Sequence, residues 1–335
     1  MKKHCQKELP PVKELDGDIT QMISTGSTLL DLAISGGRVR GGGIPGGIMV
    51  EVFGPSSAGK TVLLCELAGD VQRKKGHVMF RDPEARLNKQ FAKIFGLDFN
   101  KITYDKPDTV LDVFEPVRSW EPKPAGIVHG IFADSLAALS TEMEMDGKDN
   151  YGMRRAKEFS EQCRLTCRTL TENNFLMVCS NQIRQNLEAG PYGQKYKSPG
   201  GEAIAFYSSL RLRFSNPSKI KRKKTIAGKE QTRVVGVESE IEVFKSSVWE
   251  PYRTAPLVIL FNYGVDDIRS NLQFIKTNTK STTYTLGGDN LGKGIEDAIS
   301  AVEEDGRTGE LKQETIDVWE DVESVFKIQR KGKVR

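Results

Sequence analysis

Residues Ile48–Val62, IMVEVFGPSSAGKTV, carry the strongest structural signal in this chain. Its first part, Ile48–Phe53, is mostly apolar and predicts a buried strand. Gly54–Thr61 then matches the phosphate-loop pattern G-x-x-x-x-G-K-S/T. The run that follows, Val62–Arg73, contains no proline and predicts a helix. Strand, glycine loop and helix is the order that this motif requires in order to bind a nucleotide.

The residue types of the phosphate loop suit an anion. Gly54 and Gly59 let the backbone turn so that several N–H groups point at one phosphate, at the positive end of the next helix. Lys60 would place a cation on the β- and γ-phosphates, and Thr61 would offer its hydroxyl to Mg²⁺. The loop therefore predicts ATP and Mg²⁺ as cofactors, and the alternative is a plain glycine turn. The nucleotide-binding candidates of this loop are Gly54, Pro55, Ser56, Ser57, Ala58, Gly59, Lys60 and Thr61.

Length and composition set bounds on the rest. The 335 residues can form one large α/β domain plus a small appendage. No apolar run approaches the roughly 20 residues of a membrane helix, and the N-terminus lacks the apolar region of a secretory signal. The five cysteines form no C-x-x-C pair, so we expect free thiols in a reducing cytoplasm. A net charge of +4 is too small to identify the partner.

The rest of the chain is predicted to alternate between helices and strands. We expect a short helix capped by Ser27 or Thr28 and a glycine-rich loop over Gly36–Gly47. The predicted further helices are Asn88–Phe95, Asp108–Val117, Gly152–Thr171, Leu291–Val302 and Glu314–Val325. The predicted further strands are Gly76–Asp82, Gly126–Ala133, Phe175–Cys179, Leu210–Phe214, Glu238–Phe244 and Leu257–Phe261. This order predicts an α/β fold with a mostly parallel central sheet and antiparallel edge strands.

Three parts of the chain differ in composition. Residues 1–23 are expected to be an extended arm, and residues 24–269 to be the core. Residues 270–335 are expected to form a small α+β C-terminal domain with a basic end. Within the core, Lys219–Lys224 (KIKRKK) is predicted to be a solvated hairpin tip that would also attract phosphates.

Two predicted strands end on polar residues that suit a nucleotide site. Gly126–Ala133 ends on Asp134, which fits the second nucleotide motif, in which a carboxylate holds the Mg²⁺ shell. Phe175–Cys179 ends on Ser180-Asn181-Gln182. The carboxyl ends of parallel strands carry ligand groups in open α/β sheets. We therefore expect Asp134 and Gln182 near the phosphate loop.

A long segment after Gln182, Ile183–Glu202, is rich in Gly and Pro and lacks helical or strand periodicity. A loop this long inside a compact domain is usually functional or disordered. Basic and aromatic side chains alternate in it, which suits a nucleic-acid backbone and unstacked bases, and the alternative is a solvated surface loop. Its candidate DNA-binding side chains are Arg184, Tyr192, Lys195, Tyr196 and Lys197.

Several motifs, in order from about Ser24 to Ile268, resemble those of the bacterial RecA recombinase family. They include STGSTLLDLAI ahead of the phosphate loop, GPSSAGKT, FRDPEARLN, IFADSLAAL, SNQIR and SPGGEAIAFYSSLRLRF. The resemblance implies a RecA-like ATPase core. It also implies a DNA-stimulated ATP hydrolase that forms nucleoprotein filaments on single-stranded DNA and exchanges strands with a homologous duplex.

The resemblance also implies roles for single residues. Glu84 would orient or deprotonate the attacking water, Asp134 would be the metal-associated carboxylate, and Gln182 would sense the γ-phosphate. Lys60 and Lys245 would be the catalytic cations, Lys245 acting on the neighbouring subunit's ATP. The implied adenine contacts are Asn88 and Phe91, and Tyr263 is a further nucleotide-binding candidate. The implied further DNA contacts are Arg154, Arg155, Gly200 and Gly201. Residues Met143–Tyr151 resemble the first DNA loop, and ATP would order Ile183–Gly201 as the second.

The chain departs from the family in three places. Ser247 stands where the family has a second lysine beside Lys245, so stimulation across the subunit interface is expected to be weaker or supplied differently. Residues 1–20 lack an evident long helix for filament assembly, and the end of the chain is basic where the family's is acidic. These differences suggest a divergent, phage-encoded member.

The alternatives are a ring-forming helicase or translocase on the same core, and an accessory protein that binds ATP without hydrolysing it. The expected partners are single- and double-stranded DNA, further copies of the chain in a helical filament, and single-strand-binding and mediator proteins. The expected location is the bacterial cytoplasm, or the host cytoplasm for a phage protein.

Overall fold

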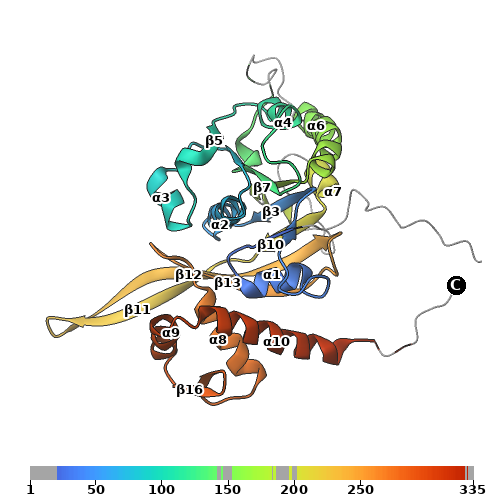
Figure 1. Ribbon diagram of the computed structural model, residues 1–335. Coiled ribbons are helices and arrows are strands. Elements are labelled where there is room, and N and C mark those ends of the chain that lie inside the picture. The colour runs from blue at the N-terminus through green and yellow to red at the C-terminus, as the bar shows by residue number, and fades with distance from the viewer. Residues whose placement is uncertain are drawn as a thin grey trace, which may run out of the picture.

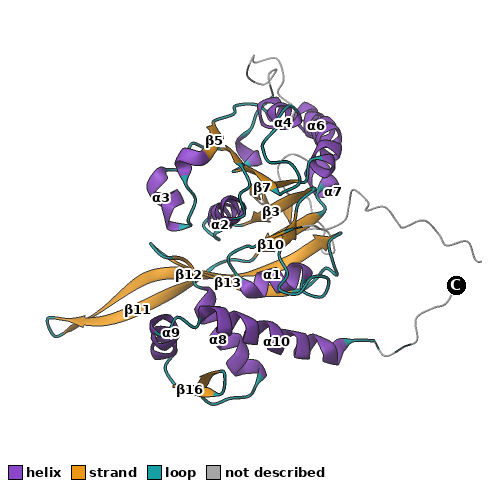
Figure 2. Ribbon diagram, viewed as in Figure 1, coloured by secondary structure: helices purple, strands orange, loops and turns teal. Residues whose placement is uncertain are grey.

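The computed structural model describes residues 21–141, 145, 153–182, 184–185, 196–197, 202–328 and 330. Its centre is a 10-stranded sheet, seen nearly edge-on in Figures 1 and 2. The parallel part runs in the order β10 (Leu210–Phe214), β3 (Ile48–Gly54), β7 (Phe175–Gln182), β6 (His129–Ala133), β4 (Val78–Arg81) and β5 (Ile102–Asp105). The antiparallel part continues from β10 through β12 (Lys229–Ser246), β13 (Thr254–Leu260) and β14 (Gly264–Val265), with β11 (Ser218–Ile226) paired to β12. The predicted α/β class, with a mostly parallel sheet and antiparallel edge strands, is confirmed.

Helices cover both faces of the parallel part. One core cluster packs α2 (Lys60–Arg73) and α3 (Lys89–Ile94) against one face, and a second packs α4 (Val110–Arg118) and α6 (Met153–Glu172) against the other. Burial on both faces explains why the central strands are apolar runs without strict alternation. In β3, for example, Val50 belongs to the first cluster and Met49 to the second.

The apolar stripe of α6 faces the core. Phe159, Cys163 and Leu170 are buried and belong to the same cluster as Phe114 of α4. The rings of Phe114 and Phe159 pack edge to face, with their centroids 6.4 Å apart and their planes at 85°. The 3.6-residue period therefore identified a packing face.

The C-terminal part packs below the sheet in Figure 1. It contains α8 (Asp267–Asn278), β15 (Tyr284–Leu286), β16 (Asp289–Gly292), α9 (Ile295–Glu304) and α10 (Thr308–Phe326). It has its own cluster of buried side chains, and α10 also contacts α1 (Thr28–Ser35), where Leu32 packs with Ile316 and Trp319. The boundary that we predict at residue 270 lies inside α8. Asn278–Tyr284 links α8 to β15.

The small N-terminal elements follow the predicted signals. The Ser27 side chain accepts a hydrogen bond from the Leu30 N–H and caps α1. Inside the glycine-rich stretch, β2 (Ile44–Pro45) pairs with β1 (Met22–Ile23), a pairing too short for a sequence pattern to indicate. The arm before residue 21 lies outside the described residues.

Some expectations were wrong in detail. Lys219–Lys224 lies within β11, and the tip of the protruding β11–β12 hairpin is Ala227-Gly228, both with positive φ. Ser180–Gln182 belong to β7, because the strand continues beside β3 up to Gly54↔Gln182. Short elements without a strong pattern were missed, namely β5, the 3₁₀ turns Phe99–Lys101 and Leu136–Ala138, α7 (Ala203–Tyr207), and β8 (Arg184–Gln185) paired with β9 (Tyr196–Lys197).

Across the part of the chain that the structure describes, no helix combines the length and apolarity needed to span a bilayer.

Candidate nucleotide-binding site

The phosphate loop connects β3 to α2 and needs glycine at both motif positions. Gly59 precedes α2 with φ 103°, and a Cβ there would lie 2.3 Å from Ile259 Cδ1. Gly54 has φ 153°, and a Cβ there would lie 2.7 Å from the Phe214 Cβ. A side chain at either position would therefore strain the backbone and clash with the strands beside it.

Lys60 and Thr61 open α2, so both stand at the positive end of a helix. The Lys60 ammonium donates to the carbonyl oxygens of Gly54 at 3.0 Å and Pro55 at 2.6 Å. Burial lowers the pKa of Lys60, and the nearby carboxylates Asp134 and Glu84 oppose that shift. The loop thus holds its cation at the mouth of an anion-binding turn.

Asp134 follows β6 directly and meets the phosphate loop. Its Oδ2 accepts a hydrogen bond from Thr61 Oγ1 at 2.5 Å, and its Oδ1 accepts one from the Ser180 hydroxyl. Burial raises the pKa of Asp134, and these two hydrogen bonds oppose the rise. Hydroxyl and carboxylate oxygens are the donors that Mg²⁺ prefers, so the pair fits the predicted metal.

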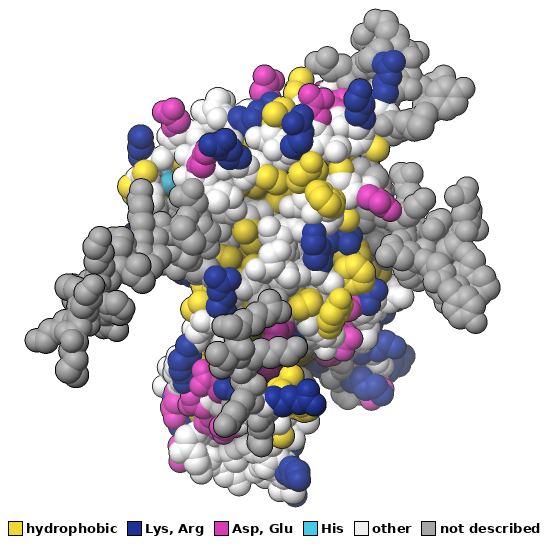
Figure 3. Space-filling view, turned by 90° about the vertical axis from the view of Figure 1, so that its right-hand side faces the viewer, with side chains coloured by type: hydrophobic (Ala, Val, Ile, Leu, Met, Phe, Trp, Pro, Cys, Tyr) yellow, Lys and Arg dark blue, Asp and Glu magenta, His cyan; other side chains and the backbone are white. Residues whose placement is uncertain are grey.

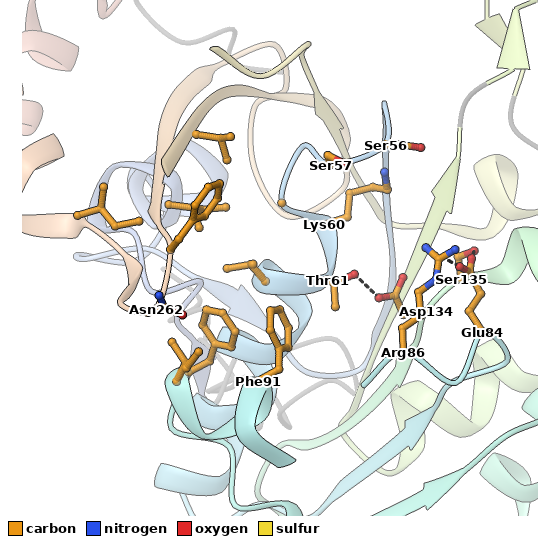
Figure 4. A pocket seen from close by; sticks show the side chains of 18 of the residues that line it. Ser56, Ser57, Lys60, Thr61, Glu84, Arg86, Phe91, Asp134, Ser135 and Asn262 are labelled. Carbon is orange, nitrogen blue, oxygen red and sulfur yellow. Dashed lines mark hydrogen bonds and ion pairs between the residues drawn. The ribbon is translucent and has the colours of Figure 1, made fainter. Parts of the chain in front are cut away.

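Glu84 lies beyond Asp134 at the same end of the cavity as the phosphate loop and is held from two sides (Figure 4). Ser135 Oγ donates to its Oε1 at 2.6 Å, and Arg86 Nη1 lies 2.7 Å from its Oε2. Ser135 and Arg86 were not among the predicted site residues. Their only sequence signal is position, one residue after Asp134 and two after Glu84.

These groups line one end of a cavity of about 570 Å³, and Gln182 at the end of β7 also lines it. The other end is apolar. From α3 it is lined by Phe91, Ile94 and Phe95, with the Phe91 and Phe95 ring centroids 4.8 Å apart. The facing wall consists of Val237, Ile259, Leu260, Phe261 and Asn262. One charged end and one aromatic end suit a phosphorylated nucleoside, with phosphates at Lys60 and a base at Phe91.

The wall from β12, β13 and the two residues after β13 could not be predicted, because nothing in its own residues marks it as a ligand site. Some predicted residues lie outside the cavity lining. Asn88 caps α3 by accepting a hydrogen bond from Phe91 N, and the Tyr263 hydroxyl lies 3.5 Å from Glu303. Lys245 lies on β12 and donates to α7 carbonyls. The predicted residues Gly54, Pro55 and Ala58 also do not line the cavity. The carbonyl oxygens of Gly54 and Pro55 accept hydrogen bonds from the Lys60 ammonium.

The predicted DNA-binding residues divide into two groups. Arg154 and Arg155 lie at the start of α6, where Arg155 donates to the carbonyls of Leu136 and Ala137. Arg154, Lys157, Arg164 and Arg168 are exposed along α6, and Figure 3 shows Lys and Arg side chains interspersed with hydrophobic ones on the face that carries this helix.

The second group falls on the long segment after Gln182. Tyr192, Lys195, Gly200 and Gly201 lie outside the described residues, as do the side chains of Arg184, Tyr196 and Lys197. The backbone pairs Arg184 with Lys197. Of Met143–Tyr151, the predicted first DNA loop, only Met145 is described.

Comparison with known proteins identifies relatives over most of the chain. The family model for the RecA N-terminal domain matches residues 10–266. The chain is 33% identical to Protein RecA of Borrelia duttonii (strain Ly) over 293 residues, which cover 84% of this chain and 76% of that protein. It is 30% identical to Protein RecA of Acholeplasma laidlawii (strain PG-8A) over 295 residues, covering 85% and 83%. For Protein RecA of Crocosphaera subtropica the identity is 30% over 310 residues, covering 90% and 84%.

Proposed function

The chain belongs to the RecA family, and we propose that it is a DNA-dependent ATPase recombinase. It would form a filament on single-stranded DNA, pair that strand with a homologous duplex and exchange strands in recombination and repair. The ring-forming helicase and the accessory ATP-binding protein are not favoured by the family assignment.

The observation that carries the proposal is the hydrogen bond from Thr61 Oγ1 to Asp134 Oδ2, which is 2.5 Å long. Glu84 lines the same cavity. A phosphate loop joined to a carboxylate on a neighbouring strand supports nucleotide binding with a divalent metal. A second carboxylate facing the same space supports hydrolysis of that nucleotide.

The substrate would be ATP, with its phosphates on the backbone N–H groups of Gly54–Thr61. Lys60 would leave the Gly54 and Pro55 carbonyls and bind the β- and γ-phosphates. Thr61 and Asp134 would hold Mg²⁺, which would offset charge on the phosphoryl oxygens. Phe91 would stack on the base at the apolar end of the cavity.

Glu84 would orient the attacking water and accept its proton. Ser135 and Arg86 hold both carboxylate oxygens, so they would fix the direction in which Glu84 faces. Gln182 would contact the γ-phosphate and report it to the segment that follows it. ATP would thereby order Ile183–Gly201 on single-stranded DNA, and Lys245 would act on the ATP of the neighbouring subunit.

Phosphate contacts would make DNA binding sensitive to salt, and stacking would keep the sequence preference weak. The partners would be single-stranded DNA, duplex DNA, other copies of the chain, and single-strand-binding and mediator proteins. We place the protein in the cytoplasm of a bacterium or of a phage host.

The decisive test is ATP hydrolysis with and without single-stranded DNA, for the wild type and for Glu84→Gln. We expect DNA to stimulate the wild type, and the stimulated rate to fall by about 10²–10⁴-fold in the variant. Hydrolysis that DNA leaves unchanged would contradict the proposal. Electron micrographs of the same complexes should show helical filaments, whereas closed rings would favour a helicase.

A further inference from the structure

Glu51 is a fully buried carboxylate that the proposed chemistry does not use. It lies in β3, three residues before the phosphate loop begins. Both of its oxygens have partners: Asn181 Nδ2 donates to Oε1 at 3.1 Å, and Arg211 Nε donates to Oε2 at 2.6 Å. Burying a charge is costly unless it is paired and hydrogen-bonded, so this arrangement requires every member to be in place.

The Asn181 end of this arrangement reaches the nucleotide cavity. Asn181 is fully buried, and its Oδ1 accepts a hydrogen bond from the backbone N–H of Gln182 at 3.0 Å. Gln182 lines the cavity and is the last residue of β7. The side chain of Asn181 therefore joins the backbone of Gln182 to the carboxylate of Glu51.

On the side of Glu51 away from Asn181, the arrangement continues through Arg211 to the neighbouring strands of the sheet. Arg211 of β10 pairs with Glu51 of β3 on one side and with Lys245 of β12 on the other. Its guanidinium carbon lies 4.5 Å from the ring centroid of Phe53 and 5.3 Å from that of Phe244. These rings and the Glu51 carboxylate leave the guanidinium little freedom to move.

Lys245 is the last side chain of a row that runs from Asn181 through Glu51 and Arg211. Its ammonium donates to the carbonyl oxygens of Ala205 at 2.9 Å and Phe206 at 2.8 Å, in α7. Burial lowers the pKa of Lys245, and the positive charge of Arg211 lowers it further. Arg211 and Lys245 occupy paired positions on adjacent strands, so a displacement of Arg211 would change the electrostatic repulsion on the Lys245 ammonium at α7.

We propose that Asn181, Glu51 and Arg211 are positioning residues that couple Gln182 at the nucleotide to the placement of Lys245. This inference rests on the proposed function, because it takes Gln182 to sense ATP and Lys245 to act between subunits. A shift of Gln182 on the γ-phosphate moves the Asn181 amide, the Glu51 carboxylate follows it, and Arg211 transmits the change to Lys245. The competing interpretation is a buried ion pair that only stabilises the sheet.

The test compares DNA affinity with an ATP analogue and with ADP, and the ratio of the two affinities measures coupling. Asn181→Ala cuts the row beside the nucleotide, and Arg211→Gln cuts it near Lys245. We expect each to reduce the ratio at least fivefold, with fluorescent ATP binding within about twofold of wild type. Measurements are made well below each variant's Tm, so that loss of stability alone does not alter the ratio.

A matched control uses a second ion pair that starts from β10, Arg213 with Glu242 of β12. The Arg213 guanidinium carbon also lies over the Phe244 ring, 4.9 Å from its centroid, but the Arg213–Glu242 pair does not include Glu51. Glu242→Gln should keep the wild-type ratio. Arg211→Lys keeps a cation beside Glu51 and should retain most of the wild-type affinity ratio. If Asn181→Ala does not fold, the comparison of Arg211→Lys with Arg211→Gln tests the coupling instead.

The outcomes separate this inference from the proposed function. A wild type whose DNA affinity ignores the nucleotide would overturn both. If the DNA affinity of the wild type depends on the nucleotide but Asn181→Ala and Arg211→Gln keep the wild-type affinity ratio, the coupling alone is overturned. The coupling is also overturned if Glu242→Gln lowers the affinity ratio as much as these two variants do. In either of these cases Glu51 and Arg211 serve only the stability of the sheet.

Discussion

Thr61 Oγ1 donates a hydrogen bond to Asp134 Oδ2 at 2.5 Å, across 73 positions of sequence. Thr61 lies in the first turn of α2 and Asp134 directly after β6, so the contact exists only because the sheet places β6 and β3 on either side of β7. Thr61 Oγ1 and Asp134 Oδ2 are the metal ligands of the proposed site.

Replacing Asp134 with Asn tests this pair. The amide removes the negative charge but keeps the size of the side chain and can still accept a hydrogen bond from Thr61. We expect DNA-stimulated ATP hydrolysis to fall by about 100-fold, comparable with the loss of one group that stabilises charge in a transition state. The Mg²⁺ concentration for half-maximal rate should rise. An unchanged Mg²⁺ dependence would remove Asp134 from the metal site.

Ser135→Ala tests whether the hydrogen bond to Glu84 positions the proposed base. The variant loses one donor to Glu84 Oε1 while the Arg86 contact remains. We expect kcat to fall by about 5–10-fold, the cost of roughly one net hydrogen bond, with the KM for ATP unchanged. Ser119→Ala, at the end of α4, is the control and should leave both constants as they are. A raised KM with normal kcat would show that Ser135 binds substrate instead.

Phe91→Ala tests the aromatic end of the cavity. Loss of stacking on the base should raise the KM for ATP by about 3–10-fold, since an aromatic pair contributes about 0.5–1.5 kcal/mol. The kcat should change little, because the base lies far from the reacting phosphate. Phe91→Tyr keeps the ring and should behave as the wild type. Equal KM values for the alanine variant and the wild type would place the base elsewhere.

Glu66 predicts a pH dependence of stability. Burial raises its pKa from 4.5 to about 7, and the hydrogen bond that its Oε1 accepts from Val265 N is long at 3.4 Å. The folded state therefore binds the proton more tightly than the unfolded state, so stability from this group is full below about pH 4.5. It decreases as the pH rises towards 7.

Replacing Glu66 with Gln removes the loss of stability that ionisation of Glu66 causes as the pH rises. The variant should be more stable than the wild type by about 1–3 kcal/mol at pH 8, because one pH unit of pKa difference corresponds to about 1.4 kcal/mol. The advantage should shrink as the pH falls to 4.5, as measured by thermal or urea unfolding across this range. Glu115→Gln, at an exposed position of α4, should show no such trend. A constant difference at every pH would contradict the assignment to Glu66.

The fold class and the charged half of the candidate site could be predicted from local sequence patterns. The phosphate loop is local: the glycines, Lys60 and Thr61 follow one another, and a strand before them and a helix after them are visible as apolar and helical patterns. Asp134 could also be found, because an apolar strand that ends in a carboxylate is a local signal. The family motifs then gave Glu84 and Gln182 their expected roles.

Which residues distant in sequence come into contact could be seen only in the folded chain. The cavity wall from β12 and β13, the Ser135 hydroxyl on Glu84, and the row from Asn181 through Glu51 to Arg211 join residues by strand order. Hydrophobic periodicity says that a strand is buried but not which strand lies beside it. A buried carboxylate such as Glu51 therefore looks like an interruption of an apolar run until folding brings the amide and guanidinium groups that it needs to neighbouring strands.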